Sequence, residues 1–232
     1  MRDLARVAGL VAAVPLGALA RWRRGRPMHP RGAVFDAVLV RTGVDPPCGV
    51  PWLDAPATDD VVVRMSRGTG LPAPLPDLLG LAIRVPGEEH PVDLLLTTTG
   101  RGALTRLLPV PRRDAAAVYS SIMSYRSDAG AVRLAALPED AGAASEPRPL
   151  AGTVARERLR FTLAAACGRG PWRPYARLTL TAPRQPLDPD LAFDAVLRPP
   201  PGLVPDGPIA RFRQPAYATA RAAREGGCPE GA

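Results

Sequence analysis

The sequence contains neither lysine nor asparagine, so its net charge of +8 comes entirely from arginine. Without lysine the chain has no phosphate-loop lysine, no Schiff-base lysine and no kinase-type lysine, and this excludes three large classes of enzyme. The two histidines, His29 and His90, lie at no zinc-like spacing from the three cysteines, which are odd in number and far apart. Neither a disulfide framework nor a structural zinc site is therefore predicted.

A long hydrophobic run is also lacking. The apolar stretch Val7–Ala20 contains Gly9, Pro15 and Gly17 and is too short and too broken to span a bilayer. The arginines at 21–26 that follow it are on the wrong side for an exported signal peptide. We predict an N-terminal helix over residues 1–21, packed on the domain of a cytoplasmic protein, with association to a membrane surface or cleavage as the alternatives. The remaining arginines are spread along the chain, which makes nucleic acid an unlikely partner.

Glycine and proline are abundant, at 22 and 29 of 232 residues, which favours many short elements over long helices. Runs rich in Val, Ile, Leu and Thr between turn residues predict eight strands. These are Val34–Val40, Val61–Ser66, Leu79–Val85, Val92–Thr98, Ala131–Ala136, Leu159–Ala166, Ala176–Thr181 and Leu191–Ala195. Most neighbouring runs have no helix-length spacer between them, so the strands are expected to pair antiparallel and to close into a barrel.

The rest of the chain is assigned to peripheral elements. Besides residues 1–21, helices are expected at Ala103–Leu108, Asp114–Tyr125 and Ile209–Glu225, and Pro138–Ala151 is expected to be a loop. No segment has the composition of a domain linker. We therefore predict one domain over residues 1–225 and a flexible tail over 226–232.

Several short motifs follow one another in a recognisable order. Residues 26–32 read R-x-x-H-x-x-G before the first strand, residues 62–66 read V-V-R-M-S, and residues 77–80 read D-x-x-G. Near the C-terminus come R-L-x-L, A-F-D, V-P and finally R-x-x-x-Y, which ends at Tyr217. Together these segments resemble the haem catalase family over residues 22–98 and 170–224. The resemblance implies an eight-stranded antiparallel catalase-like barrel with flanking helices, shorter than a catalase, and haem as the cofactor.

The resemblance implies a haem site built from both ends of the chain. Tyr217 would be the ligand of the haem iron, since a phenolate is a hard anionic donor, and Arg213 four residues earlier lies on the same helix face and favours the phenolate. The haem propionates need cations, which Arg26, Arg64 and Arg221 would supply.

On the other side of the haem, His29 is expected to take the proton of a bound peroxide, and Ser66 to fix the tautomer of the histidine ring. The family has an asparagine after the fourth strand that polarises peroxide. This chain has threonines at 97–99, and Thr98 or Thr99 is expected to offer a hydroxyl there. Because a hydroxyl is a weaker donor, the expected activity is that of a weak peroxidase or a hydroperoxide-converting oxidoreductase.

Two other functions stay open at the level of sequence. A barrel of the same kind without haem would act as a binding protein for a small hydrophobic or anionic ligand. A hydrolase such as a phosphodiesterase, working through arginines and His29, is the third hypothesis, although the chain has no G-x-S-x-G motif. For the assembly, a monomer or dimer is expected.

Overall fold

The computed structural model describes residues 29–208, 210 and 211. The described residues form ten strands, two short helices and one 3₁₀ turn. The strands are β1 (Arg31–Arg41), β2 (Ala57–Arg67), β3 (Leu79–Val85), β4 (Val92–Thr98), β5 (Tyr119–Ser120), β6 (Ser124–Ser127), β7 (Gly130–Pro138), β8 (Leu159–Cys167), β9 (Arg173–Pro183) and β10 (Val204–Asp206). The helices are α2 (Pro51–Asp54) and α3 (Pro147–Glu157), and the 3₁₀ turn is η1 (Thr105–Leu107).

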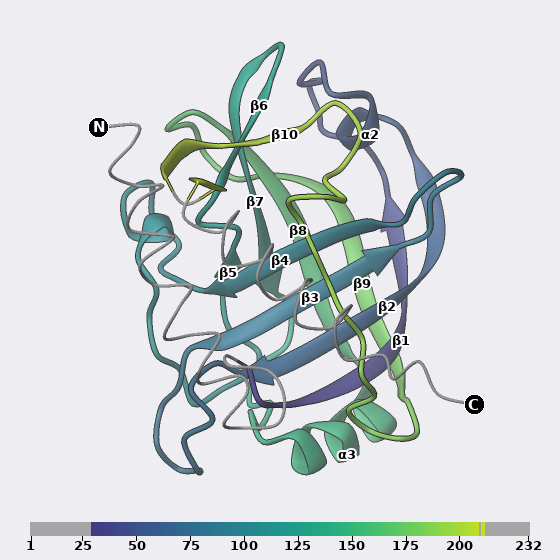
Figure 1. Ribbon diagram of the computed structural model, residues 1–232, viewed down its shortest axis with the longest axis vertical. Coiled ribbons are helices and arrows are strands. Elements are labelled where there is room, and N and C mark those ends of the chain that lie inside the picture. The colour runs from purple at the N-terminus through teal and green to yellow at the C-terminus, as the bar shows by residue number, and fades with distance from the viewer. Residues whose placement is uncertain (1–28, 209, 212–232) are drawn as a thin grey trace, which may run out of the picture.

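Eight of the strands close into a barrel (Figure 1). Their order is β7-β5-β4-β3-β2-β1-β9-β8, and β8 pairs back with β7 to complete the ring. Each of these pairings is antiparallel, while β6 and β10 branch from β7 outside the ring. The predicted eight-stranded antiparallel barrel is thus confirmed. Closure leaves the ring strands without free edges, as expected for so small a sheet.

The apolar core fills the barrel interior because side chains alternate between the two faces of each strand. In β2, Val61, Val63 and Met65 belong to the core cluster, whereas the side chains between them point outward. The core also contains an edge-to-face pair of aromatic rings, Tyr119 and Phe161, with centroids 5.9 Å apart. The interior is therefore a packed core and not a ligand cavity.

A helix closes each end of the barrel (Figure 1). Helix α3 packs against β1 and β9 and buries Leu150 and Val154 in the core. At the other end α2 buries Trp52 and Leu53, and the Trp52 ring lies 6.0 Å from that of Tyr175. None of the helices in residues 29–208 is long and apolar enough to cross a membrane.

The segment between β9 and β10 crosses the outer face of the barrel, in front of β2, β3 and β4 (Figure 1). Ionic and hydrogen-bonded contacts hold it there. Asp93 of β4 accepts the backbone N–H of Asp194 at 2.8 Å, and the Asp93 N–H donates to the carbonyl of Arg198 at 2.8 Å. This crossing segment, residues 184–203, covers part of the outer face of β2–β4.

Three sequence-based assignments are wrong. Leu191–Ala195 is not a strand, because it belongs to the crossing segment and takes part in none of the strand pairings of the described sheet. Asp114–Tyr125 is not a helix: it holds the two-residue strand β5, which completes the ring between β4 and β7. Pro138–Ala151 is not wholly a loop, since α3 begins at Pro147, where a proline in the first helical turn lacks only an N–H that would be unpaired anyway.

The remaining assignments have mixed outcomes. The expected helix Ala103–Leu108 is the shorter 3₁₀ turn η1. Residues 1–21, most of Ile209–Glu225 and the tail 226–232 lie outside the described residues, so these predictions stay predictions.

Candidate functional site on the outer face of the barrel

His29 and Ser66 lie together where β1 begins and β2 ends. The Nδ1 atom of His29 is 2.9 Å from the Oγ atom of Ser66, within hydrogen-bonding distance. His29 has a positive φ of 58°, and its backbone N–H donates to the carbonyl of Gly68 at 2.8 Å. A left-handed conformation is unfavourable for a residue with a side chain, so these contacts are what hold the ring in this position.

Gly80 of β3 forms the floor under the histidine ring. It lies opposite Ser66 in the β2–β3 register, and its outward side faces the ring. A Cβ atom at Gly80 would come within 2.6 Å of His29 Cε1 and 2.9 Å of Ser66 Oγ. Only glycine lets the imidazole lie this close to the strand. The D-x-x-G motif contains this residue, but its role is visible only when the strands are paired.

Arg64, two residues before Ser66 on the same face of β2, is fixed by an ion pair with the crossing segment. Its Nε and Nη2 atoms donate to the two carboxylate oxygens of Asp188 at 2.8 and 2.9 Å. Nη2 also donates to the carbonyl of His29 at 3.0 Å, and the side chain is buried. A Cβ atom at Gly32 would lie 2.7 Å from this guanidinium, so a second glycine makes room for it. The pair links the crossing segment to the backbone of His29.

The threonine on this face is Thr97, which corrects the sequence-based choice of Thr98. Thr97 lies opposite Gly80, which itself lies opposite Ser66, so these residues form a row across β4, β3 and β2. Thr98 alternates with Thr97 and lies on the inner side with Leu94 and Leu96, fully buried, and its Oγ1 accepts the backbone N–H of Leu79 at 3.1 Å. Thr99 is fully buried beyond the strand end.

The loop between β2 and β3 holds the backbone of His29 in place. Asp77 accepts hydrogen bonds from the backbone N–H groups of Thr69, Gly70 and Leu71 and from the Thr69 hydroxyl, at 2.7 to 3.1 Å. Burial alone raises the pKa of Asp77, but these hydrogen bonds outweigh it and lower the pKa below its usual value. The loop carries Gly68, whose carbonyl anchors His29.

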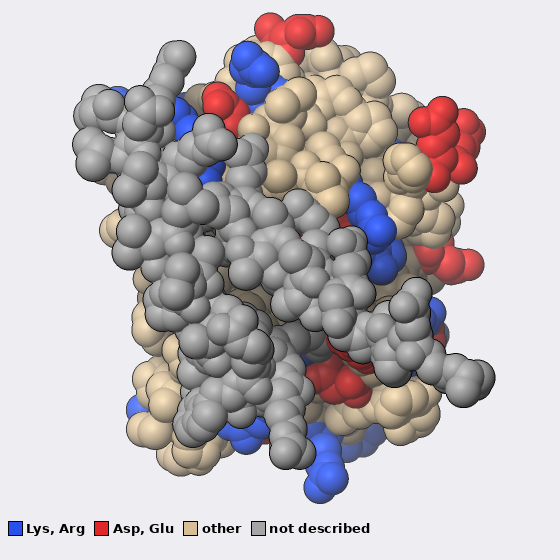
Figure 2. Space-filling model, in the orientation of Figure 1, with Lys and Arg blue, Asp and Glu red and all other residues tan. Residues whose placement is uncertain are grey.

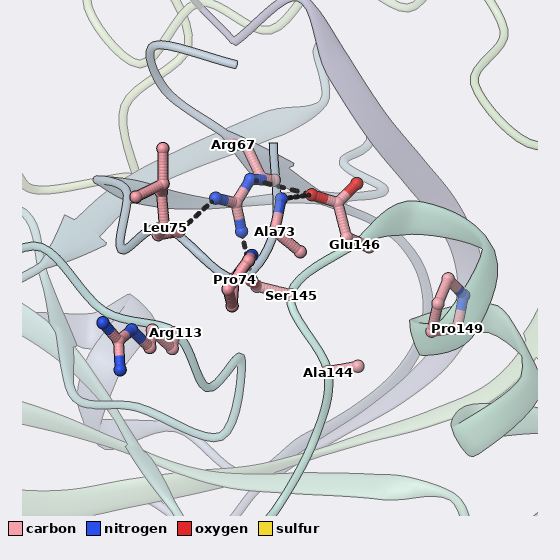
Figure 3. A pocket seen from close by; sticks show the side chains of 9 residues that line it. All are labelled: Arg67, Ala73, Pro74, Leu75, Arg113, Ala144, Ser145, Glu146 and Pro149. Carbon is pink, nitrogen blue, oxygen red and sulfur yellow. Dashed lines mark hydrogen bonds and ion pairs between the residues drawn. The ribbon is translucent and has the colours of Figure 1, made fainter. Parts of the chain in front are cut away.

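Arg67 secures the same loop from the other side (Figure 3). Its guanidinium is 1% exposed and donates to the carbonyls of Leu71 and Leu75 and to the Ser145 hydroxyl. It also lies 3.4 Å from a carboxylate oxygen of Glu146. Arg67, Leu75, Ser145 and Glu146 are among the residues that line a pocket of about 280 Å³ beside the β2–β3 loop. Arg67 is fully engaged in structure, and we assign it to the support of the site.

The described residues thus bring together three of the predicted site residues: His29, Ser66 and Arg64. Arg26, Arg213, Tyr217 and Arg221 lie outside the described residues. No group of three or more His, Cys, Asp or Glu within residues 29–208 is arranged to hold a metal ion. Figure 2 shows charged side chains of both signs scattered around this side of the molecule, with uncharged surface between them.

The fold belongs to a known class. No family model matches the sequence, and no curated protein matches it. Among solved structures it is similar to a fungal catalase (14% identity, TM-score 0.58), catalase A from Saccharomyces cerevisiae (12%, 0.57) and a bacterial catalase (13%, 0.58). Each likeness covers 89% of this chain and between 59% and 63% of the catalase.

These likenesses show that the chain has the catalase fold, as the order of its motifs predicted. The chain spans about three fifths of the length of these catalases. At 12–14% identity the comparison shows the fold only. Any activity has to be argued from the residues of the site.

Proposed function

We propose that this chain is a haem-binding protein that converts peroxides or hydroperoxides, with His29 as its acid and base. The observation that carries the proposal is the contact of 2.9 Å between His29 Nδ1 and Ser66 Oγ on the outer face of a catalase-fold barrel. A glycine floor, a strained backbone at His29 and the Arg64 contact to its carbonyl all hold this one ring. A side chain held by so many distant partners suits a role in catalysis.

The described residues fit one side of a haem site. Gly80 lets the imidazole of His29 lie close to β3. The other side chains of the row, Ser66 and Thr97, are small, so the histidine ring is the largest side chain at this place. Tyr217 would hold the iron, with Arg213 beside it, and Arg26 and Arg221 would pair with the propionates. Haem, when bound, supplies the redox chemistry that breaks the O–O bond of a peroxide.

For Arg64 we propose a positioning role in place of the expected propionate contact. Since its Nε and Nη2 atoms already donate to Asp188, it serves to position His29 and the crossing segment, and it is not available as a simple propionate partner. The propionate charge would therefore fall to the other arginines.

The proton step depends on the tautomer of His29. When Nδ1 carries the proton and donates it to Ser66 Oγ, the basic lone pair lies on Nε2. Nε2 then accepts the proton of the hydroperoxide O–H as substrate binds, and returns it to the departing oxygen as O–O cleavage proceeds. Ser66 holds the ring in place, and its hydroxyl can accept the Nδ1 proton of this tautomer.

Thr97 explains why the turnover should be slow. It occupies the β4 position of the row, and its hydroxyl donates to the Leu79 carbonyl at 3.2 Å. A hydroxyl engaged with the backbone polarises peroxide less than an amide does. We therefore expect a peroxidase or hydroperoxide-converting activity and not rapid disproportionation of hydrogen peroxide.

Replacement of His29 tests the proposal, with the other histidine as a matched control. In protein made with haem supplied, His29→Ala should keep haem and lose about 10²- to 10⁴-fold in the rate of reaction with peroxide. His90→Ala, in the exposed β3–β4 turn, should react like the wild type. If His29→Ala reacts at the wild-type rate, the assignment of His29 is wrong.

A second candidate function rests on the Arg64–Asp188 pair. An internal carboxylate already neutralises this arginine, as it would in a barrel that no longer holds haem and binds a small apolar or anionic ligand instead. Protein that purifies without haem when haem is supplied, and still folds, would favour this candidate.

A further inference from the structure

The opposite side of the barrel carries a buried arginine with unusual surroundings. Arg106, in η1, is 1% exposed. The described groups that contact its guanidinium are two carbonyls and an aromatic ring, all of them neutral. Its Nε donates to the carbonyl of Ala103 at 3.1 Å, and its Nη2 donates to the carbonyl of Gly170 in the β8–β9 turn at 3.0 Å. Its guanidinium lies 4.8 Å from the centroid of the Trp172 ring. These contacts orient the cation but leave its charge unbalanced.

Arg133 of β7 brings a second positive charge to the same place. It lies on the outer face of its strand, since Val132 and Leu134 on either side belong to the core. Its Nε atom is buried and has no hydrogen-bond partner. Trp172, whose ring lies beside Arg106, packs against the cluster of Ala135, Leu137 and Ala164, and Ala135 is two residues from Arg133 on the same face of β7. The two arginines are therefore neighbours. In agreement with this, burial lowers the pKa of both arginines, and the charge of Arg133 lowers that of Arg106 further.

Within the described residues, carboxylates are missing from the segments that carry this pair and its contacts. Residues 94–113, 129–138 and 158–187 contain neither Asp nor Glu. In the part of the chain that the structure describes, no ion pair joins Arg106 or Arg133 to an acidic group, whereas Arg64, Arg67 and Arg84 each have one. Arg101 in segment 94–113 and Arg169 in segment 158–187 add further positive charge. A hydrogen bond from Trp172 Nε1 to the Arg101 carbonyl joins these two segments.

We propose that Arg106 and Arg133 form a binding site for an oxyanion, the phosphate group of a small ligand. Guanidinium groups present planar pairs of donors that match the oxygens of phosphate. Two positive charges are balanced by one phosphate dianion, whereas a single carboxylate would balance only one of them. The Nε of Arg133 would gain the acceptor that it lacks. The site is on the far side of the ring from His29 and does not depend on the proposed haem chemistry.

The test uses the full chain and inorganic phosphate as the probe. Thermal unfolding is measured in phosphate and in chloride at equal ionic strength, for the wild type, Arg133→Met and the control Arg177→Met. Arg177 is also an arginine of the barrel, but it is exposed and paired with Glu139, so its loss changes the net charge equally at a different place. Phosphate at tenfold excess over its dissociation constant should raise the wild-type Tm by about 3 °C.

The expected pattern is specific. Arg177→Met keeps the rise in Tm, Arg133→Met loses it, and in chloride Arg133→Met is at least as stable as the wild type because an unbalanced, partly buried charge is gone. An equal rise for phosphate and chloride, or for wild type and Arg133→Met, would overturn the site. An equal rise with acetate would overturn its assignment to phosphate. A large drop in the Tm of Arg133→Met in chloride would show that Arg133 already has an internal role, which also contradicts the proposal.

Discussion

Successive residues of strands β2, β3 and β4 point to opposite faces of the barrel wall, and the two faces differ in polarity. On the inner face, Val63, Leu81 and Leu94 are apolar and fully buried in the core. On the outer face, Arg64 and Ser66 are also largely buried, but their partners are polar groups from distant parts of the chain: Asp188 and the His29 carbonyl for Arg64, and the His29 ring for Ser66. The inner face therefore supplies the apolar core of the barrel, and the outer face carries the polar contacts of the candidate site.

The difference also shows how the site tolerates polar burial. Asp188 reaches Arg64 from the crossing segment, and His29 reaches Ser66 from the segment before β1. Because each polar group has its partner, the outer face is covered without a large loss of stability. The following predictions alter one face at a time, from the largest expected change in the free energy of unfolding to the smallest.

Leu81→Ala should give the largest loss. Leu81 is 1% exposed and lies in the core, so the substitution removes buried methyl groups and leaves a cavity. We expect a loss of about 2–5 kcal/mol in the free energy of unfolding, measured by urea denaturation. A loss as small as that of a surface substitution would show that Leu81 does not face the core.

Asp77→Asn should cost about 1.5–3 kcal/mol at neutral pH, because charged hydrogen bonds to the β2–β3 loop are replaced by weaker ones. The pKa of Asp77 is lower in the folded protein than in the unfolded chain. Its contribution is therefore complete above the unfolded value of about 3.9 and is lost as the pH falls through the lower folded value. Urea denaturation between pH 7 and pH 2 should show the difference between wild type and variant vanish on the acid side. A difference that is independent of pH would contradict this.

Thr98→Val should cost about 1–3 kcal/mol, because the buried N–H of Leu79 loses its acceptor. Its neighbour Thr97→Val is the control on the outer face and should cost less, since Thr97 is only partly buried and its hydroxyl contact to the Leu79 carbonyl is longer, at 3.2 Å. The same pair bears on function: Thr97→Asn should raise peroxide turnover, and Thr98→Asn should destabilise the barrel. Equal effects at the two positions would mean that the face assignment is wrong.

Gly80→Ala should change stability by no more than about 1 kcal/mol, because the new Cβ displaces a side chain and not the backbone. Its effect should appear in His29, whose ring must move away from Ser66. The chain has two histidines, so the ring signals in an NMR spectrum are assigned with His90→Ala. An unchanged His29 signal in Gly80→Ala would show that the ring does not rest on β3.

The strands were largely predictable from the sequence, and the exceptions have physical causes. β3 and β4 have the predicted bounds because each is an apolar run between clear turn residues. β5 was missed because it has two residues, and tertiary pairing with β4 and β7 forms it where the local pattern favours a helix.

The site was predictable only in part. His29, Ser66 and Arg64 carry recognisable motifs, and the structure places them in contact. Asp188 gave no local signal, because its role arises where the crossing segment meets β2. Of the threonines at 97–99, the structure places Thr97 on the outer face, and not the candidates Thr98 and Thr99. The alternation with Leu94 and Leu96 was a signal that could have assigned Thr97 to the outer face.

The absorption spectrum of the protein made with haem supplied tests the central claim most directly, namely that the outer face holds haem. The account predicts a coloured protein with the spectrum of five-coordinate, tyrosinate-ligated ferric haem. Tyr217→Phe should abolish or strongly change that spectrum. The control Tyr175→Phe, at a buried tyrosine of the core, should leave it unchanged. A colourless protein, or a spectrum that is indifferent to the loss of Tyr217, would contradict the account.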